Sequence, residues 1–149
     1  MSESQARILV IDDDENIRKV VCAILKDKGY NVDTAGSGNE AIIKTRQGHY
    51  DLMLVDIRLP DMEGTEILTR INDTVPRIRK IMVTGYPTLQ NAVTAVNQGA
   101  DAYIMKPFDV EKMLATIEEQ LKKQKEDRKF SEERVAAFIE TRVKELEKS

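Results

Sequence analysis

Five short apolar runs rich in Ile and Val alternate with amphipathic helical patterns along most of the chain, and this alternation limits the possible folds. The runs occupy residues 7–11, 31–35, 51–55, 80–84 and 102–105. Strands that alternate with helices build βα units, which assemble into a parallel sheet with helices on both faces. The sequence therefore predicts an α/β fold with a doubly wound, five-stranded parallel sheet.

The segments between the runs have helical spacing. In the first segment Ile17, Val21 and Leu25 recur every four residues, and Gly29 follows where a glycine commonly ends a helix. Similar patterns cover residues 40–47, 65–72, 89–98 and 110–121. The last of these helices should pack against the sheet through one apolar stripe, formed by Val110, Met113, Leu114, Ile117 and Leu121.

The composition argues against several classes of function. The net charge is −3, and the part up to residue 121 is acidic, so it lacks the basic surface that nucleic acid binding requires. No apolar run approaches the roughly 18 residues of a membrane-spanning helix. The single cysteine, Cys22, and the absence of a signal-peptide pattern fit a cytoplasmic protein. We therefore expect neither nucleic acid nor membrane as a partner of this segment.

Polar side chains stand at the carboxyl ends of four of the five runs. Asp12 and Asp13 follow the first run, Asp56 follows the third, Thr84 closes the fourth and Lys106 follows the fifth. In open α/β sheets, ligands bind outside the carboxyl ends of the strands. We therefore expect these five side chains to meet at one edge of the sheet.

This group of side chains predicts phosphoryl-transfer chemistry. Converging carboxylates repel one another unless a cation lies among them, and Mg²⁺ binds through carboxylates, water and phosphate oxygens. Lys106 and Thr84 would offer a positive charge and a hydroxyl donor to phosphate. A carboxylate can itself accept the phosphoryl group. Taken singly, Asp56 also fits an ordinary turn, and Asp14 fits the N-cap of a helix from about Glu15.

Five segments, in order and at suitable spacing, resemble those of a known family. They read ILVIDDDENIR (8–18), TAGSGNEAI (34–42), DIRLPDMEG (56–64), VTGYP (83–87) and GADAYIMKPF (99–108). They are similar to the acidic pair, the entry to the second helix, the phosphoacceptor loop, and the switch-threonine and lysine–proline segments of receiver domains in two-component response regulators. The resemblance covers about residues 6 to 122 and implies a flavodoxin-like fold with strand order 2-1-3-4-5.

The resemblance implies a phosphoacceptor and a metal site. Asp56 would accept the phosphoryl group. Asp12, Asp13, Asp56 and the backbone carbonyl of Arg58 would hold Mg²⁺, with Asp13 bound directly and Asp12 through water.

The resemblance also implies how phosphorylation is read out. Lys106, ahead of a cis Lys106–Pro107 bond, and Thr84 would bind the phosphate, and Thr84 and Tyr103 would form a switch pair. The chain would be a phosphorylation-activated signalling switch that receives its phosphoryl group from a histidine kinase or phosphotransfer protein. Its interaction face would then change for a downstream output protein or domain. It would catalyse only its own phosphorylation and dephosphorylation.

Two other functions are compatible with parts of this site. The segment 8–16 resembles the nucleophile strand of haloacid-dehalogenase-type phosphatases, which are Mg²⁺-dependent enzymes with an aspartate nucleophile. That reading leaves Asp56 and Lys106 without a role, and Asn16 stands where that family has Thr or Val. The other alternative is a binding module that is never phosphorylated.

Residues 123–149 are predicted to form a charged helical extension of a domain that spans 1–122. The extension lacks Pro and Gly, which favours one continuous helix, although Ser131 before two glutamates also fits the start of a separate helix. Val135, Ile139 and Leu146 fit a heptad seam that Arg142 interrupts. The extension is therefore interpreted as a linker, as a weak dimerisation helix of a homodimer, or as a helix that packs back on its own domain.

Overall fold

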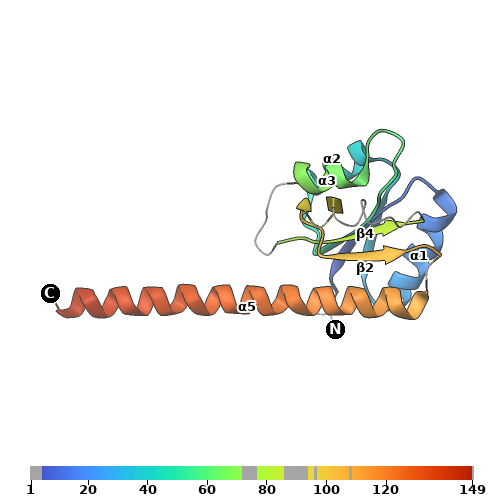
Figure 1. Cartoon of the computed structure of the whole chain (residues 1–149). Coiled ribbons are helices and arrows are strands. Elements are labelled where there is room, and N and C mark those ends of the chain that lie inside the picture. Colours follow the sequence, from blue (N-terminus) through green and yellow to red (C-terminus); the bar gives the residue numbers. More distant parts are fainter. Residues whose placement is uncertain (1–4, 72–76, 86–93, 96, 108, 149) are drawn as a thin grey trace.

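The computed structural model describes residues 5–71, 77–85, 94, 95, 97–107 and 109–148. Five strands form one parallel sheet in the order β2-β1-β3-β4-β5, which confirms the predicted topology (Figure 1). Each strand starts within one residue of its prediction. The strands are β1 (Arg7–Ile11), β2 (Asn31–Ala35), β3 (Leu52–Asp56), β4 (Arg79–Thr84) and β5 (Ala102–Met105).

Helices cover both faces of this sheet. The described helices are α1 (Glu15–Asp27), α2 (Gly38–Gln47), α3 (Gly64–Arg70) and α5 (Val110–Lys148). In Figure 1, α2 and α3 lie on one side of the sheet, and α5 passes along the other side, which it shares with α1. The helix predicted at residues 89–98 falls largely outside the described residues.

Two apolar cores result from the alternation of side chains along the strands. Leu9 and Met53 face α2 and α3, whereas Ile8 and Leu52 face α1 and α5. All four side chains are fully buried. The second core includes Val21 and Leu25 of α1, together with Met113, Ile117 and Leu121 of α5. Apolar strands buried on both faces are typical of parallel sheets, as the sequence predicted.

Helix α5 is one unbroken helix of 39 residues, so the alternative of a separate helix starting at Ser131 is wrong. Its predicted apolar stripe is buried at three positions and half-buried at Leu114. Val110 is 41% exposed, contrary to the prediction. As the first residue of the helix, it lies at the end of the packed segment.

The contacts between α5 and the domain continue past residue 122. The side-chain amide of Gln124, which is buried, donates to the backbone oxygens of Asp51 (2.9 Å) and Arg77 (2.8 Å). One turn later, Asp127 forms an ion pair with the buried guanidinium of Arg79. Hydrogen bonds and ion pairs of buried polar groups are directional, so they hold an element in one orientation. These contacts therefore fix the direction in which the rest of α5 leaves the domain.

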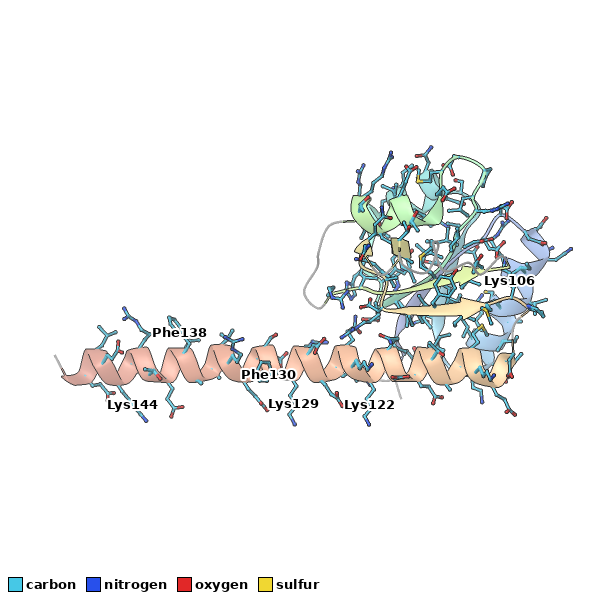
Figure 2. All side chains as sticks on the ribbon, viewed as in Figure 1. Lys106, Lys122, Lys129, Phe130, Phe138 and Lys144 are labelled. Atoms are coloured by element: carbon cyan, nitrogen blue, oxygen red, sulfur yellow. The ribbon has the colours of Figure 1, made fainter. Side chains whose placement is uncertain are left out.

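Beyond this attachment, α5 projects into solvent as a straight rod (Figure 1). Every side chain described from residue 125 to 147 is exposed. Among these are six large apolar side chains, at Phe130, Val135, Phe138, Ile139, Val143 and Leu146. Figure 2 shows Phe138 on the side of α5 that faces the domain and Lys122, Lys129 and Lys144 on the opposite side. Among the described residues, none of the helices combines the length and apolarity that a membrane crossing requires.

Gly64, at the start of α3, permits a close approach between α3 and the end of β3. A Cβ at this position would lie 2.0 Å from the backbone oxygen of Asp56. The backbone nitrogen of Gly64 donates to the oxygen of Ile57 at 2.5 Å, which closes the loop between β3 and α3. The absence of a side chain at Gly64 therefore shapes the loop that follows Asp56.

We expect Gly64→Ala to lower the free energy of unfolding by about 2 kcal/mol or more, because the backbone must move to accommodate the methyl group. Urea unfolding followed by circular dichroism measures this change. Gly85→Ala is the matched control, because its Cβ would meet no atom closer than 3.9 Å. An equal loss of stability in both variants would contradict the role assigned to Gly64.

Candidate functional site

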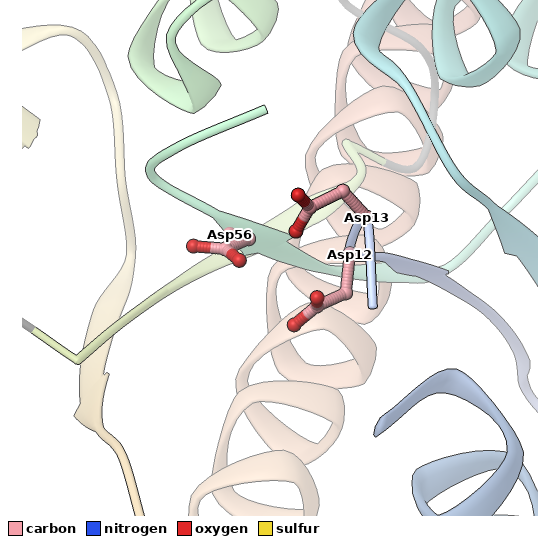
Figure 3. A group of neighbouring side chains, drawn as sticks. All are labelled: Asp12, Asp13 and Asp56. Atoms are coloured by element: carbon pink, nitrogen blue, oxygen red, sulfur yellow. The ribbon is translucent and has the colours of Figure 1, made fainter. Parts of the chain in front are cut away.

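The predicted site residues converge where the strands end. Asp12 follows β1, Asp56 is the last residue of β3, and Lys106 follows β5. Figure 3 shows the side chains of Asp12, Asp13 and Asp56 directed towards a common space. One carboxylate oxygen from each of the three lies within 4.8 Å of the other two. Asp12 and Asp56 are buried and Asp13 is exposed, so the cluster opens to solvent on the Asp13 side.

Hydrogen bonds at the start of α1 orient Asp12. Its Oδ1 accepts from the backbone nitrogen of Asp14 at 2.9 Å. The carboxylate of Asp14 in turn accepts from the nitrogens of Asn16 and Ile17, so Asp14 is the N-cap of α1, as its sequence context suggested. Nη1 of Arg18 donates to the backbone oxygen of Asp12 at 2.6 Å. The turn between β1 and α1 is therefore held from both sides.

The ammonium group of Lys106 joins the carboxylates of two different strands. Its Nζ lies 2.7 Å from Oδ2 of Asp12 and 3.1 Å from Oδ2 of Asp56. The backbone nitrogen of Lys106 donates to the oxygen of Thr84 at 2.7 Å, which holds the end of β5 against the end of β4. The bond between Lys106 and Pro107 is cis, as the resemblance implied. One cation thus offsets much of the repulsion between the two buried carboxylates.

Burial and charge act in opposite directions on Asp56. Burial raises the pKa of Asp56 above its ordinary value of 3.8, and the neighbouring carboxylate of Asp12 raises it further. Lys106 and the backbone nitrogen of Arg58, which donates to Asp56 Oδ1 at 3.2 Å, only partly oppose this. Burial alone would lower the pKa of Lys106, but the hydrogen bonds and charges of Asp12 and Asp56 outweigh it and raise that pKa.

The donor set suits a small divalent cation. Carboxylate oxygens are the ligands that Mg²⁺ prefers, and three of them gather within the distance that one ion can bridge. Within the described part of the chain, the exposed carboxylate of Asp13 has no hydrogen-bonding or ion-pair partner. The raised pKa of Asp56 also indicates that the charge of Lys106 alone does not fully compensate the cluster. The residues therefore fit a magnesium site.

The predicted switch residues lie next to this cluster. Thr84, at the end of β4, is buried. Tyr103 on β5 packs against the core that also contains Met82, its neighbour in the sheet register. Burial raises the pKa of the Tyr103 hydroxyl, and Thr84 partly opposes this rise. The hydroxyl of Tyr103 is buried and has no hydrogen-bond partner among the described residues, so the phenol points inward.

The sequence reasoning missed two residues that support the site. Arg18 binds the backbone of Asp12 from six residues away, a spacing that matches no local motif. The carboxylate of Asp61 accepts from the backbone nitrogens of Gly38 and Asn39, both at 2.8 Å, and so joins the loop after β3 to the start of α2. These hydrogen bonds lower the pKa of Asp61. No pattern in the sequence connects positions this far apart.

Comparisons with known proteins agree with this geometry. A family model described as response regulator receiver domain matches residues 8–118. The transcriptional regulatory protein ZraR of Klebsiella oxytoca is 39% identical over 121 residues, which cover 81% of this chain and 27% of that protein. The chain spans about a quarter to a half of the length of the curated relatives that it matches first.

Two solved structures extend the comparison to three dimensions. A response regulator receiver domain protein (CheY-like) from Methanospirillum hungatei JF-1 has a TM-score of 0.79 and 44% identity, over 83% of this chain and 98% of that chain. The response regulator protein TrrA from Thermotoga maritima, solved in complex with Mg²⁺-BeF, has a TM-score of 0.70 and 32% identity. That match covers 78% of this chain and 99% of the TrrA chain.

The raised pKa of Asp56 predicts a pH-dependent effect of its charge on stability. The folded state holds the proton more tightly than the unfolded state, so stability falls as the pH rises from about 3.8 through the folded-state pKa. We therefore expect Asp56→Asn to be more stable than the parent at pH 7 in a chelator, and this advantage should shrink towards pH 4. Urea unfolding at a series of pH values measures both effects.

Asp61→Asn is the control for this experiment, because the lowered pKa of Asp61 gives the opposite sign. The ionised Asp61 stabilises the fold at neutral pH, and this contribution is lost as the pH falls through its folded-state pKa. We expect Asp61→Asn to be less stable than the parent at pH 7. A destabilised Asp56→Asn variant at pH 7 would show that the charge of Asp56 is fully compensated in the fold.

Proposed function

The chain belongs to the family of response regulator receiver domains of two-component signalling, and on this premise we propose that Asp56 is its phosphoacceptor. Receiver domains are not a conventional enzyme family, and membership of this family implies a histidine kinase as a partner. One observation carries the proposal: Lys106, Asp12 and Asp56, each from the end of a different strand, meet within hydrogen-bonding distance. This arrangement leaves a buried carboxylate beside a fixed cation.

The residues of this chain would act on the phosphoryl group as follows. A carboxylate oxygen of Asp56 attacks the phosphorus of the donor, a phosphohistidine or a small acyl phosphate, and the bond from phosphorus to the donor breaks. Lys106 then exchanges part of its contact with Asp56 for a phosphoryl oxygen, whose growing negative charge it stabilises. Partial burial at the end of β3 strengthens this interaction, because the local dielectric is lower than that of water.

We propose that Asp12, Asp13 and Asp56, together with the backbone carbonyl of Arg58, hold Mg²⁺. The gathered carboxylates and the exposed Asp13 support this set, and the Arg58 carbonyl rests on the resemblance alone. When bound, the ion would supply the positive charge that lets a phosphoryl group approach three carboxylates. Asp12 has a second function in this arrangement, since it holds Lys106 when no phosphoryl group is present.

Thr84 and Tyr103 would report the phosphorylation. We propose that the hydroxyl of Thr84 donates to a phosphoryl oxygen on Asp56, and that the inward position of Tyr103 is favoured as a result. Support comes from the buried hydroxyl of Tyr103, which has no hydrogen-bond partner among the described residues, and from the influence of Thr84 on the pKa of that hydroxyl. A phosphoryl group would thus shift the populations of two side-chain arrangements by the difference in their contact energies.

The wider role of the protein is also a proposal. We propose that a histidine kinase or a phosphotransfer protein phosphorylates the chain in the cytoplasm, and that an output protein or domain recognises its changed face. The relatives are longer than this chain, since the match covers 27% of one of them and 50% of another. The division into a domain of residues 1–122 and an extension of 123–149 stays a prediction, although contacts to the sheet continue to Asp127.

With Mg²⁺ and acetyl phosphate, we expect the chain to gain one phosphoryl group, and we expect Asp56→Asn to gain none. Intact-mass spectrometry under neutral conditions measures the gain. Asp61→Asn is the matched control, because Asp61 follows in the same loop but does not belong to the carboxylate cluster. Labelling of Asp56→Asn to the extent of the parent would assign the phosphoryl group elsewhere.

We expect Mg²⁺ to raise the melting temperature of the parent, because only the folded state assembles the three carboxylates. Asp13→Asn should lose most of this response. Asp14→Asn should keep it, since Asp14 caps α1 and is not one of the clustered carboxylates, and the side-chain oxygen of Asn is about as good an N-cap as that of Asp. Equal Mg²⁺ responses in Asp13→Asn and the parent would exclude Asp13 as a ligand.

A further inference from the structure

The projecting half of α5 carries exposed apolar side chains, among them Val135 and Ile139, on the side of the helix that faces the domain. These side chains are called the tail stripe. Residues seven positions apart lie about two helical turns apart and therefore on nearly the same face of a helix. Arg128 and Val135 follow the buried Leu121 at this spacing. The stripe therefore continues the face with which α5 packs on the sheet. Phe138 lies on this side in Figure 2, whereas Lys129 and Lys144 lie on the opposite side. A partner that covers the stripe must approach from the side of the domain.

A groove of about 680 Å³ lies where the stripe meets the domain. Arg77 and Arg79 line it on the domain side. From α5, its lining includes Arg128, Glu132, Val135 and Ile139. The carboxylate of Asp101, which is mostly buried, holds both domain-side guanidiniums. Ion pairs with Asp101 therefore hold the arginines that line the domain side of the groove, and the other side of the groove is the start of the exposed stripe of α5.

The stripe has the spacing of a two-helix seam, in which seam residues recur at alternating intervals of four and three. Six positions of α5 follow this rule, namely Arg128, Glu132, Val135, Ile139, Arg142 and Leu146. Three of the six are charged and three are apolar. The order of the charges along the seam therefore decides which orientation a second helix can take.

A parallel copy of the same helix would place like charges together. In a parallel in-register pair each seam residue faces its own copy. Arg128, Glu132 and Arg142 would then form three like-charge pairs, each of which is repulsive. Because the stripe faces the domain side, a straight parallel copy would also direct its residues 110–127 into the first domain (Figure 2).

An antiparallel copy brings together opposite charges instead. In an antiparallel pair of helices, the numbers of two residues that lie opposite each other add up to the same value in every layer. When this value is 274, every seam residue lies opposite another seam residue. Val135 then lies opposite Ile139, and Glu132 lies opposite Arg142. Leu146 of each helix lies opposite the stem of Arg128 of the other. Two-fold symmetry forms each pair twice, which gives six layers without a like-charge pair.

From this complementarity we propose that a second copy of the chain occupies the groove, with its tail helix antiparallel to the first. Leu146 of the copy lies on Arg128, between α5 and the domain. The carboxylates of Glu145 and Glu147 in the copy come to the level of the groove, whose domain side carries Arg77 and Arg79. The inference does not depend on Asp56, which lies at the opposite end of β3 from this groove.

Charge reversal at the pair Glu132 and Arg142 tests the proposal on the full chain. Sedimentation equilibrium of the parent should show a concentration-dependent dimer. Arg142→Glu and Glu132→Arg should each raise the dissociation constant by roughly tenfold or more, because two attractive layers become repulsive. The double variant should recover dimerisation. Lys144→Glu and Glu133→Arg are matched controls that reverse charges on the opposite face and should dimerise like the parent.

The double variant also separates the proposal from effects within one helix. Arg142 pairs with Glu145, and Arg128 pairs with Glu132, in the same chain. Both pairs stay broken in the double variant, so a recovery must come from contacts between chains. In a parallel dimer none of the substitutions removes the like-charge layers, and neither loss nor recovery is expected. The weakest dimer that such a seam would form has a dissociation constant on the order of 100 μM. A parent that is still monomeric at about this concentration therefore overturns the proposal.

Disulfide cross-linking fixes the orientation directly in a Cys22→Ser background. An oxidised mixture of the Val135→Cys and Ile139→Cys chains should form a mixed dimer, because these positions face each other. Val135→Cys alone should cross-link poorly, since its copies lie farther apart than a disulfide can span. Efficient cross-linking of Val135→Cys alone would indicate a parallel pair and overturn the antiparallel arrangement.

Discussion

The contacts of Lys106 with Asp12 and Asp56 are the interaction on which the arrangement of the site depends. Each carboxylate is buried at the end of a different strand, and two buried negative charges at this distance would push the strand ends apart. One ammonium group between them holds the edge of the sheet together across β1, β3 and β5. One ammonium group faces two carboxylates, so the negative charge of the pair exceeds the positive charge beside it. A site that lacks part of its positive charge is suited to receive a cation.

The same requirement for paired polar groups governs the other end of the sheet. Gln124 and Asp127 carry α5 past the last core residue and bind it to the backbone of Asp51 and Arg77 and to the side chain of Arg79. Because these contacts are directional, they set the angle at which α5 leaves the domain. Because α5 continues as one helix, these contacts also set the orientation of its exposed stripe, which faces the domain side of the helix. The contacts of Gln124 and Asp127 therefore both attach α5 to the domain and determine which way its exposed seam faces.

Most of the fold could be predicted because its signals are local. Alternating apolar runs and helical stripes gave the five strands and the sheet type, and the position of Asp14 before α1 identified a helix cap. The site could be predicted for a related reason, since the carboxyl ends of parallel strands share one edge. The prediction that Val110 packs against the sheet was wrong, because its burial depends on where the helix meets the domain, which a pattern within the helix does not record. The continuous helix that the sequence favoured is confirmed, and only the alternative of a separate helix starting at Ser131 is wrong.

The sequence by itself therefore determined which residues form each strand, which polar residues stand at the strand ends, and where α1 begins. These features follow from hydrophobic periodicity and from capping, which act over a few residues. Only the tertiary structure decided that Lys106 bridges two particular carboxylates, that Arg18 and Asp61 brace the loops, and that Gly64 must lack a side chain. It also decided that the tail stripe faces the domain. The physical reason is that each of these contacts joins backbones or side chains whose distance depends on how whole elements pack, and no local pattern encodes that packing.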